Sequence, residues 1–115
     1  MTDKKYYIDV KRDSSLENRF YEAVKTLATE TGSLNKRLFN SYYNFLFPIY
    51  SEHFKENDLR EKLAYVESIF KDNSKCTHYK HFTGGYLHCH WKESKQMAEN
   101  IFYIYETINA MQKNK

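Results

Sequence analysis

"MAENIFYIYETINAM", residues 97–111, is the most regular apolar pattern in the chain and determines most of the predicted fold. Its apolar side chains recur every three or four residues, which is the spacing of one face of an α-helix. They are Met97, Ile101, Ile104, Tyr105, Ile108 and Met111. Ser94 precedes the pattern and is a favourable N-cap residue, so a long amphipathic helix is predicted to begin there.

Two other stretches show the same helical periodicity. In the first, residues 13–15 are favourable N-cap residues and Gly32 is a favourable residue just past the end of the helix. An apolar stripe lies between them. That stripe consists of Leu16, Phe20, Ala23, Val24, Leu27 and Ala28. In the other, Asp58 and Glu61 have capping-box spacing, and the stripe that follows consists of Leu59, Leu63, Val66, Ile69 and Phe70. Both stretches are predicted to be helices with one buried face.

The segment from Leu34 to about Phe54 is also predicted to be helical, with a kink or a restart at Pro48 because proline removes a backbone donor. It is apolar around most of its circumference. Phe39, Tyr43 and Phe47 recur four residues apart, beside the main apolar stripe. Such a helix either lies at the centre of the fold or offers one aromatic face to a partner.

Two stretches predict β-structure. "KYYIDVK", residues 5–11, alternates apolar and polar side chains as a half-buried strand does. "KCTHYKHFTGGYLHCHW", residues 75–91, has the Gly-Gly pair of a tight hairpin turn between two short runs. Together with the helices, they predict an α+β class for a single domain over residues 1–115. Strand 5–11 and a hairpin over 76–92 would form a three-stranded antiparallel sheet covered by about four helices.

The predicted hairpin carries four of the five histidines of the chain. With either turn length, three of them share one face, so a transition metal ion could be bound by His88 and His90 with His81 or His78. A metal-independent ribonuclease using the same histidines as acid and base is a second possibility. A solvent-facing sheet surface is the ordinary explanation and the one favoured here, because the spacing matches no zinc signature. No cofactor is therefore expected.

Composition bounds the class of protein. The chain has 41% hydrophobic and 17% aromatic residues, 11 of them Tyr, and a formal charge of +3. It shows no apolar leader and no run long enough to cross a membrane. We expect a soluble, cytoplasmic protein, in which Cys76 and Cys89 are free thiols because their offset across the hairpin exceeds the reach of a disulfide. The bias toward Lys, Asn, Tyr and Ile suits an AT-rich bacterial or phage genome.

The sequence shows no paired carboxylates near the histidines, no nucleophile with an evident base and no phosphate-binding loop. We therefore expect a non-enzymatic module that binds another protein, such as an inhibitor, an immunity protein or a phage anti-defence protein. Phe39, Tyr43 and Phe47 are the predicted partner-binding residues, for another protein or for a second copy in a homodimer. Single-stranded nucleic acid is the alternative ligand, bound by aromatic and lysine side chains of the hairpin region.

Overall fold

The computed structural model describes residues 7–71 and 91–113, and in these ranges the chain is all-helical. The elements are α1 (Ser14–Thr29), α2 (Leu34–Ser41), a π-helical turn η1 (Tyr42–Leu46), a 3₁₀ turn η2 (Ser51–His53), α3 (Asn57–Lys71) and α4 (Trp91–Lys113). No strand occurs within the described ranges. The predicted α+β class with a three-stranded sheet is therefore wrong. The described ranges contain four α-helices, the number predicted, but the helix predicted from Leu34 to about Phe54 is α-helical only to Ser41 and continues as η1.

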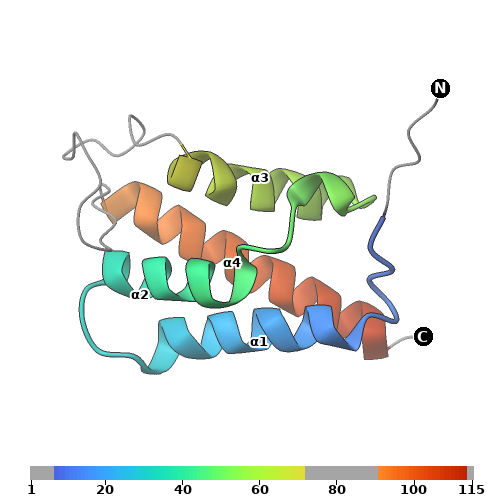
Figure 1. Ribbon diagram of the computed structural model, residues 1–115, viewed down its shortest axis with the longest axis horizontal. Helices are drawn as coiled ribbons and strands as arrows, with labels where there is room; N and C mark the ends of the chain where they lie inside the picture. The colour runs from blue at the N-terminus through green and yellow to red at the C-terminus, as the bar shows by residue number, and fades with distance from the viewer. Residues whose placement is uncertain (1–6, 72–90, 114–115) are drawn as a thin grey trace.

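The helices form two layers (Figure 1). α1 and α2 run antiparallel beside each other, α3 lies on the far side of α2, and α4 crosses behind them. α4 packs against α1, α2 and α3, whereas α2 and α3 make no close backbone contact with each other within the described residues. Side chains therefore have to span the distance between α2 and α3.

The core is built mainly from the apolar stripes that the periodicity predicted. On α4, Met97, Ile101, Ile104 and Ile108 are fully buried and face the other three helices. The remaining fully buried large side chains come from every other part of the fold: Phe20, Leu38, Leu46, Phe54, Leu59, Leu63 and Ile69. Burying apolar area of this kind is the main source of folding free energy.

Helix ends follow local capping chemistry. Asp13 caps α1 by accepting a hydrogen bond from Leu16 N at 3.1 Å, and Ser33 caps α2 by accepting one from Lys36 N at 3.1 Å. Gly32 lies between the two helices with φ +106°, a conformation that favours glycine. The prediction for α4 was wrong at its start, because the helix begins at Trp91 and Ser94 is buried inside it, bonded to Asn35.

The N-terminal segment is not a strand. Ile8 and Val10 are buried, as the alternation predicted, but residues 10–12 form a turn in which Arg12 N and Asp13 N both donate to Asp9 O at 3.0 Å. Ile8 N donates to His53 O at 2.9 Å, which is a single contact and not a ladder. The segment covers the core beside the end of α4, where Gln112 Nε2 donates to Val10 O at 2.9 Å.

The predicted hairpin over 76–92 lies largely outside the described residues. Its last two residues, 91 and 92, belong to α4 and are helical. Cys76 and Cys89 also lie outside the described ranges. Among the helices in these ranges, none combines the length and the apolar character needed to cross a membrane.

Candidate functional site

Phe39, Tyr43 and Phe47 form a row of rings that we call the aromatic ridge. The ring centroids of Phe39 and Tyr43 are 4.8 Å apart, and those of Tyr43 and Phe47 are 5.5 Å apart. Tyr43 is 39% exposed and Phe47 51%, whereas Phe39 is half-buried against the core. The structure thus brings the three predicted residues together, with two of them open to solvent.

A π-helical turn produces this alignment. Phe47 N donates to Tyr42 O at 2.7 Å, five residues back, so the chain is wider here than an α-helix. Over four residues an α-helix makes slightly more than one rotation and the wider turn slightly less, so the two in succession keep residues four apart in line. Leu38, Tyr42 and Leu46 consequently share the buried side, and the ridge residues next to them share the outer side. A regular α-helix would wind both rows around its axis.

Two buried rings support the ridge from below. Tyr42 stacks on Phe70 of α3, with centroids 4.2 Å apart and planes 7° from parallel. Phe70 also meets Tyr43 edge-on at 5.4 Å, and Tyr42 meets Phe47 edge-on at 6.1 Å. These contacts join η1 to α3 across the space between α2 and α3. The exposed rings are therefore fixed in place, because each one contacts a buried ring.

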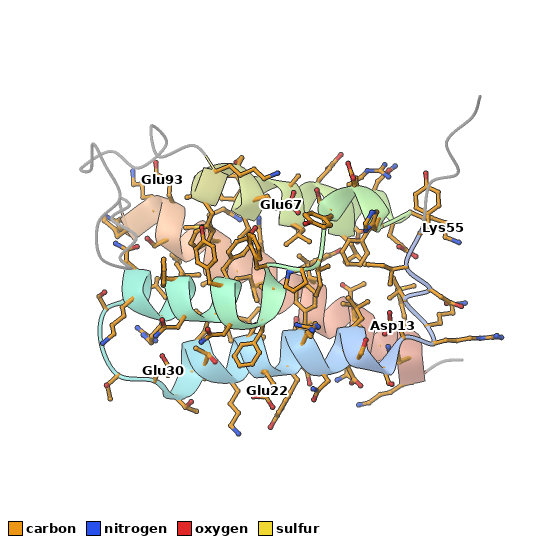
Figure 2. The ribbon with its side chains drawn as sticks, in the orientation of Figure 1. Asp13, Glu22, Glu30, Lys55, Glu67 and Glu93 are labelled. Carbon is orange, nitrogen blue, oxygen red and sulfur yellow. The ribbon has the colours of Figure 1, made fainter. Side chains whose placement is uncertain are left out.

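A buried carboxylate holds the chain that follows the ridge. Glu67 of α3 is 8% exposed and accepts hydrogen bonds from Ser51 N at 2.8 Å and from Ser51 Oγ at 2.7 Å. Figure 2 labels Glu67 on α3, on the side where the connection from η1 to η2 passes. Burial, with Glu67 nearby, raises the pKa of Tyr42 to about 12, so its hydroxyl is protonated at neutral pH.

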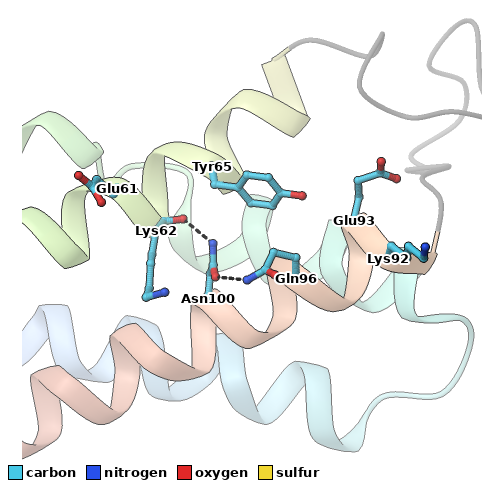
Figure 3. Close-up of a pocket in the computed structure, with 7 residues that line it drawn as sticks. All are labelled: Glu61, Lys62, Tyr65, Lys92, Glu93, Gln96 and Asn100. Atoms are coloured by element: carbon cyan, nitrogen blue, oxygen red, sulfur yellow. Dashed lines mark hydrogen bonds between the residues drawn. The ribbon is translucent and has the colours of Figure 1, made fainter.

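A second surface feature is a polar cleft of about 550 Å³ between α3 and α4 (Figure 3). It is lined by Glu61, Lys62, Tyr65, Lys92, Glu93, Gln96 and Asn100. Asn100 Nδ2 donates to Lys62 O at 3.1 Å, and Gln96 Nε2 donates to Asn100 Oδ1 at 2.8 Å. Burial and the nearby Glu93 raise the pKa of Tyr65.

The charges of the cleft balance, because two carboxylates and two ammonium groups line it. Its two amides already bond to each other or to backbone. These lining residues include no histidine, cysteine or serine that would serve as a nucleophile or a base. The cleft therefore offers weaker evidence for function than the ridge does.

The predicted histidine site is not tested by the structure, because His78, His81, His88 and His90 lie outside the described residues. Within 7–71 and 91–113, no group of three His, Cys, Asp or Glu side chains is placed to hold a metal ion. His53, the one histidine in those ranges, packs edge-on against Tyr50 at 5.6 Å.

Sequence reasoning missed the two residues that fix the ridge, Phe70 and Glu67. Glu67 carried a usable signal, since it stands four residues after Leu63 on the buried stripe of α3. A carboxylate on a buried face requires hydrogen-bond donors, and Ser51 supplies them. Phe70 was predicted to be buried, but its contact with Tyr42 depends on how α2 and α3 are placed in space.

Comparison with known proteins gives no further guide: no family model, no curated protein and no solved structure matches the chain.

Proposed function

We propose that this protein is a non-enzymatic binding module that seats a partner protein on the aromatic ridge. It would act by covering a surface of that partner, as inhibitors and immunity proteins do. The observation that carries the proposal is that Tyr43 and Phe47 are exposed although buried rings hold both of them. Rigid, exposed aromatic side chains are typical anchors of protein interfaces, because little conformational entropy is lost when they bind.

The arrangement of the rings favours protein over single-stranded nucleic acid. Proteins that bind single strands stack bases on aromatic faces that are open. Here neighbouring ridge rings are tilted by 46° and 34° and touch one another, so no base fits between them. A contiguous row of exposed rings matches an apolar groove on another protein.

The test is a photo-crosslinking capture with matched controls. A photoreactive phenylalanine analogue replaces Phe47, or in a second variant Phe102, which is 40% exposed on α4. Both variants are exposed to bacterial lysate, and the crosslinked protein is identified and purified. We expect one partner to be captured from position 47 and not from position 102.

Binding of the purified partner is then measured with alanine variants. Tyr43→Ala and Phe47→Ala should each weaken binding by about 2 kcal/mol or more. Phe47→Ala should lower the free energy of unfolding by about 1 kcal/mol, and Tyr43→Ala by about 1 to 2 kcal/mol, because the Tyr43 ring also contacts Phe70. The controls Tyr21→Ala and Phe102→Ala, at exposed aromatics of α1 and α4, should leave binding unchanged. Losses of 3 kcal/mol or more in folding stability for both ridge variants, or equal capture from position 102, would refute the proposal.

A further inference from the structure

The segment that carries the aromatic ridge has no acidic residue. From Thr31 to Ser51 the chain contains no Asp or Glu, and its charged residues are Lys36 and Arg37. Lys36 is exposed and lies three and seven residues before Phe39 and Tyr43, which places it on the ridge side of the helix. Arg37 is held elsewhere, because its guanidinium donates to Leu27 O at 2.7 Å and to Gly32 O at 3.2 Å.

A second lysine lies at the end of α3, directly after a ring that supports the ridge. Phe70, whose ring contacts Tyr43 at 5.4 Å, is followed directly by Lys71, which is exposed. Lys36 and Lys71 therefore stand on two different helices that border the same aromatic surface. We call these two residues the basic rim.

Two carboxylates on neighbouring elements accept hydrogen bonds from residues close to the ridge. Both oxygens of Glu67 accept hydrogen bonds from Ser51, and the residue is buried. Glu30, labelled in Figure 2 at the end of α1, accepts a hydrogen bond from Asn40 Nδ2 at 2.9 Å. Glu67 is buried, whereas Glu30 is exposed and follows α1 and not the helix of the ridge.

Two exposed aromatics of α4 have acidic neighbours on the same helix. On α4, Phe102 and Tyr103 stand between Glu99 and Glu106, both of which are exposed, and Tyr103 Oη donates to Asp58 at 2.7 Å. Lys62 Nζ also lies 4.6 Å from the centroid of the Tyr103 ring, so this part of the surface is mixed in charge, whereas the segment of the ridge carries no acidic residue.

We propose that the partner of the ridge is a protein whose contact surface has an apolar groove bordered by Asp and Glu side chains. This inference rests on the proposed function and specifies the chemistry of its partner. Complementary charge at the rim of an interface accelerates association and selects against other partners. A two-fold contact between two copies through the ridge would place a basic rim against a basic rim, so a second copy is not the occupant.

The probe is a library of randomised helical peptides, selected for binding to the wild-type protein. Clones are kept if they lose binding to Tyr43→Ala and Phe47→Ala but still bind Tyr21→Ala and Phe102→Ala. We expect these clones to combine large apolar residues with Asp and Glu, and to bind more weakly as the salt concentration rises. Lys36→Glu and Lys71→Glu should each weaken binding by about tenfold at low salt, whereas Lys25→Glu and Lys95→Glu, exposed on α1 and α4, should not.

The outcomes separate the two proposals. Ridge-dependent peptides without acidic enrichment and without salt dependence would overturn the acidic partner and leave the binding module intact. A library that yields no ridge-dependent peptide would count against both. Ridge-dependent binding of an oligothymidylate, or a dimer in sedimentation analysis that Phe47→Ala dissociates, would also overturn the acidic partner, in favour of nucleic acid or of a second copy.

Discussion

Replacing Glu67 with alanine removes the acceptor of two hydrogen bonds and should lower the free energy of unfolding by about 2 to 5 kcal/mol. Glu67 and Ser51 are 8% and 9% exposed, so water does not readily replace the missing acceptor. The N–H and the O–H of Ser51 would each lose a partner, and a buried donor without a partner costs about 1 to 3 kcal/mol. Since a domain of this kind is stabilised by about 5 to 15 kcal/mol, the loss is readily measured.

Urea unfolding followed by circular dichroism gives the value. With a slope of about 1.5 kcal/mol per molar urea, a loss of 3 kcal/mol lowers the midpoint by about 2 M. Glu67→Gln should cost only about 1 kcal/mol, because the amide oxygen can accept from Ser51 N and the amide nitrogen can donate to Ser51 Oγ. Glu61→Ala, at an exposed glutamate of the same helix, is the matched control and should change stability by about 0.5 kcal/mol or less.

A double-mutant cycle shows whether the effect acts through Ser51. Ser51→Ala removes one of the two donors, so it should make the further change Glu67→Ala less costly by about 1 kcal/mol. Strict additivity of the two changes, or a cost of Glu67→Ala no greater than that of Glu61→Ala, would refute the assignment of Glu67 as the residue that holds the chain behind the ridge.

Three further outcomes are expected. The pKa of Tyr42 is about 12 in the folded protein and about 10 when unfolded, so its contribution to stability is full below pH 10 and is lost as the pH rises to 12. In urea titrations at each pH, the free energy of unfolding of the wild type should therefore fall by about 2 kcal/mol more than that of Tyr42→Phe over this interval. Phe20→Ala, at a ring that is 0% exposed, should cost about 3 to 5 kcal/mol in thermal unfolding, and a cost below 1 kcal/mol would contradict the assigned core. Gln112→Ala should lower the free energy of unfolding by about 1 to 2 kcal/mol and accelerate amide exchange at Ile8, because Gln112 Nε2 donates to Val10 O and Asp13 O, both at 2.9 Å. Unchanged exchange would show that these bonds do not hold the N-terminal segment.

The helices were predictable because each buries one face, and burial leaves a periodic trace in the sequence. Leu16, Phe20 and Leu27 on α1, like Leu59 and Leu63 on α3, lie on the predicted sides. The β-structure was not predictable on the same grounds. Alternation over seven residues correctly indicated that Ile8 and Val10 are buried, but an extended chain lying over helix ends alternates as a paired strand does.

For the candidate site, the sequence identified the rings but not their support. Four-residue spacing placed Phe39, Tyr43 and Phe47 in one row, and the chain forms that row through a π-turn that no periodicity predicted. One of the two rings that support the row, Phe70, comes from α3, more than twenty residues further along the chain. Contacts of that kind depend on tertiary packing, which local sequence patterns do not specify.

The position of α4 also has a consequence for biosynthesis. α1, α2 and α3 leave the ribosome before it, yet each of them packs against α4, whose Met97, Ile101, Ile104 and Ile108 complete the core. Until those side chains emerge, the apolar faces of the earlier helices lack their common partner. The chain therefore cannot reach its native packing during translation of its first three helices, and the nascent chain would display the kind of apolar surface that chaperones recognise.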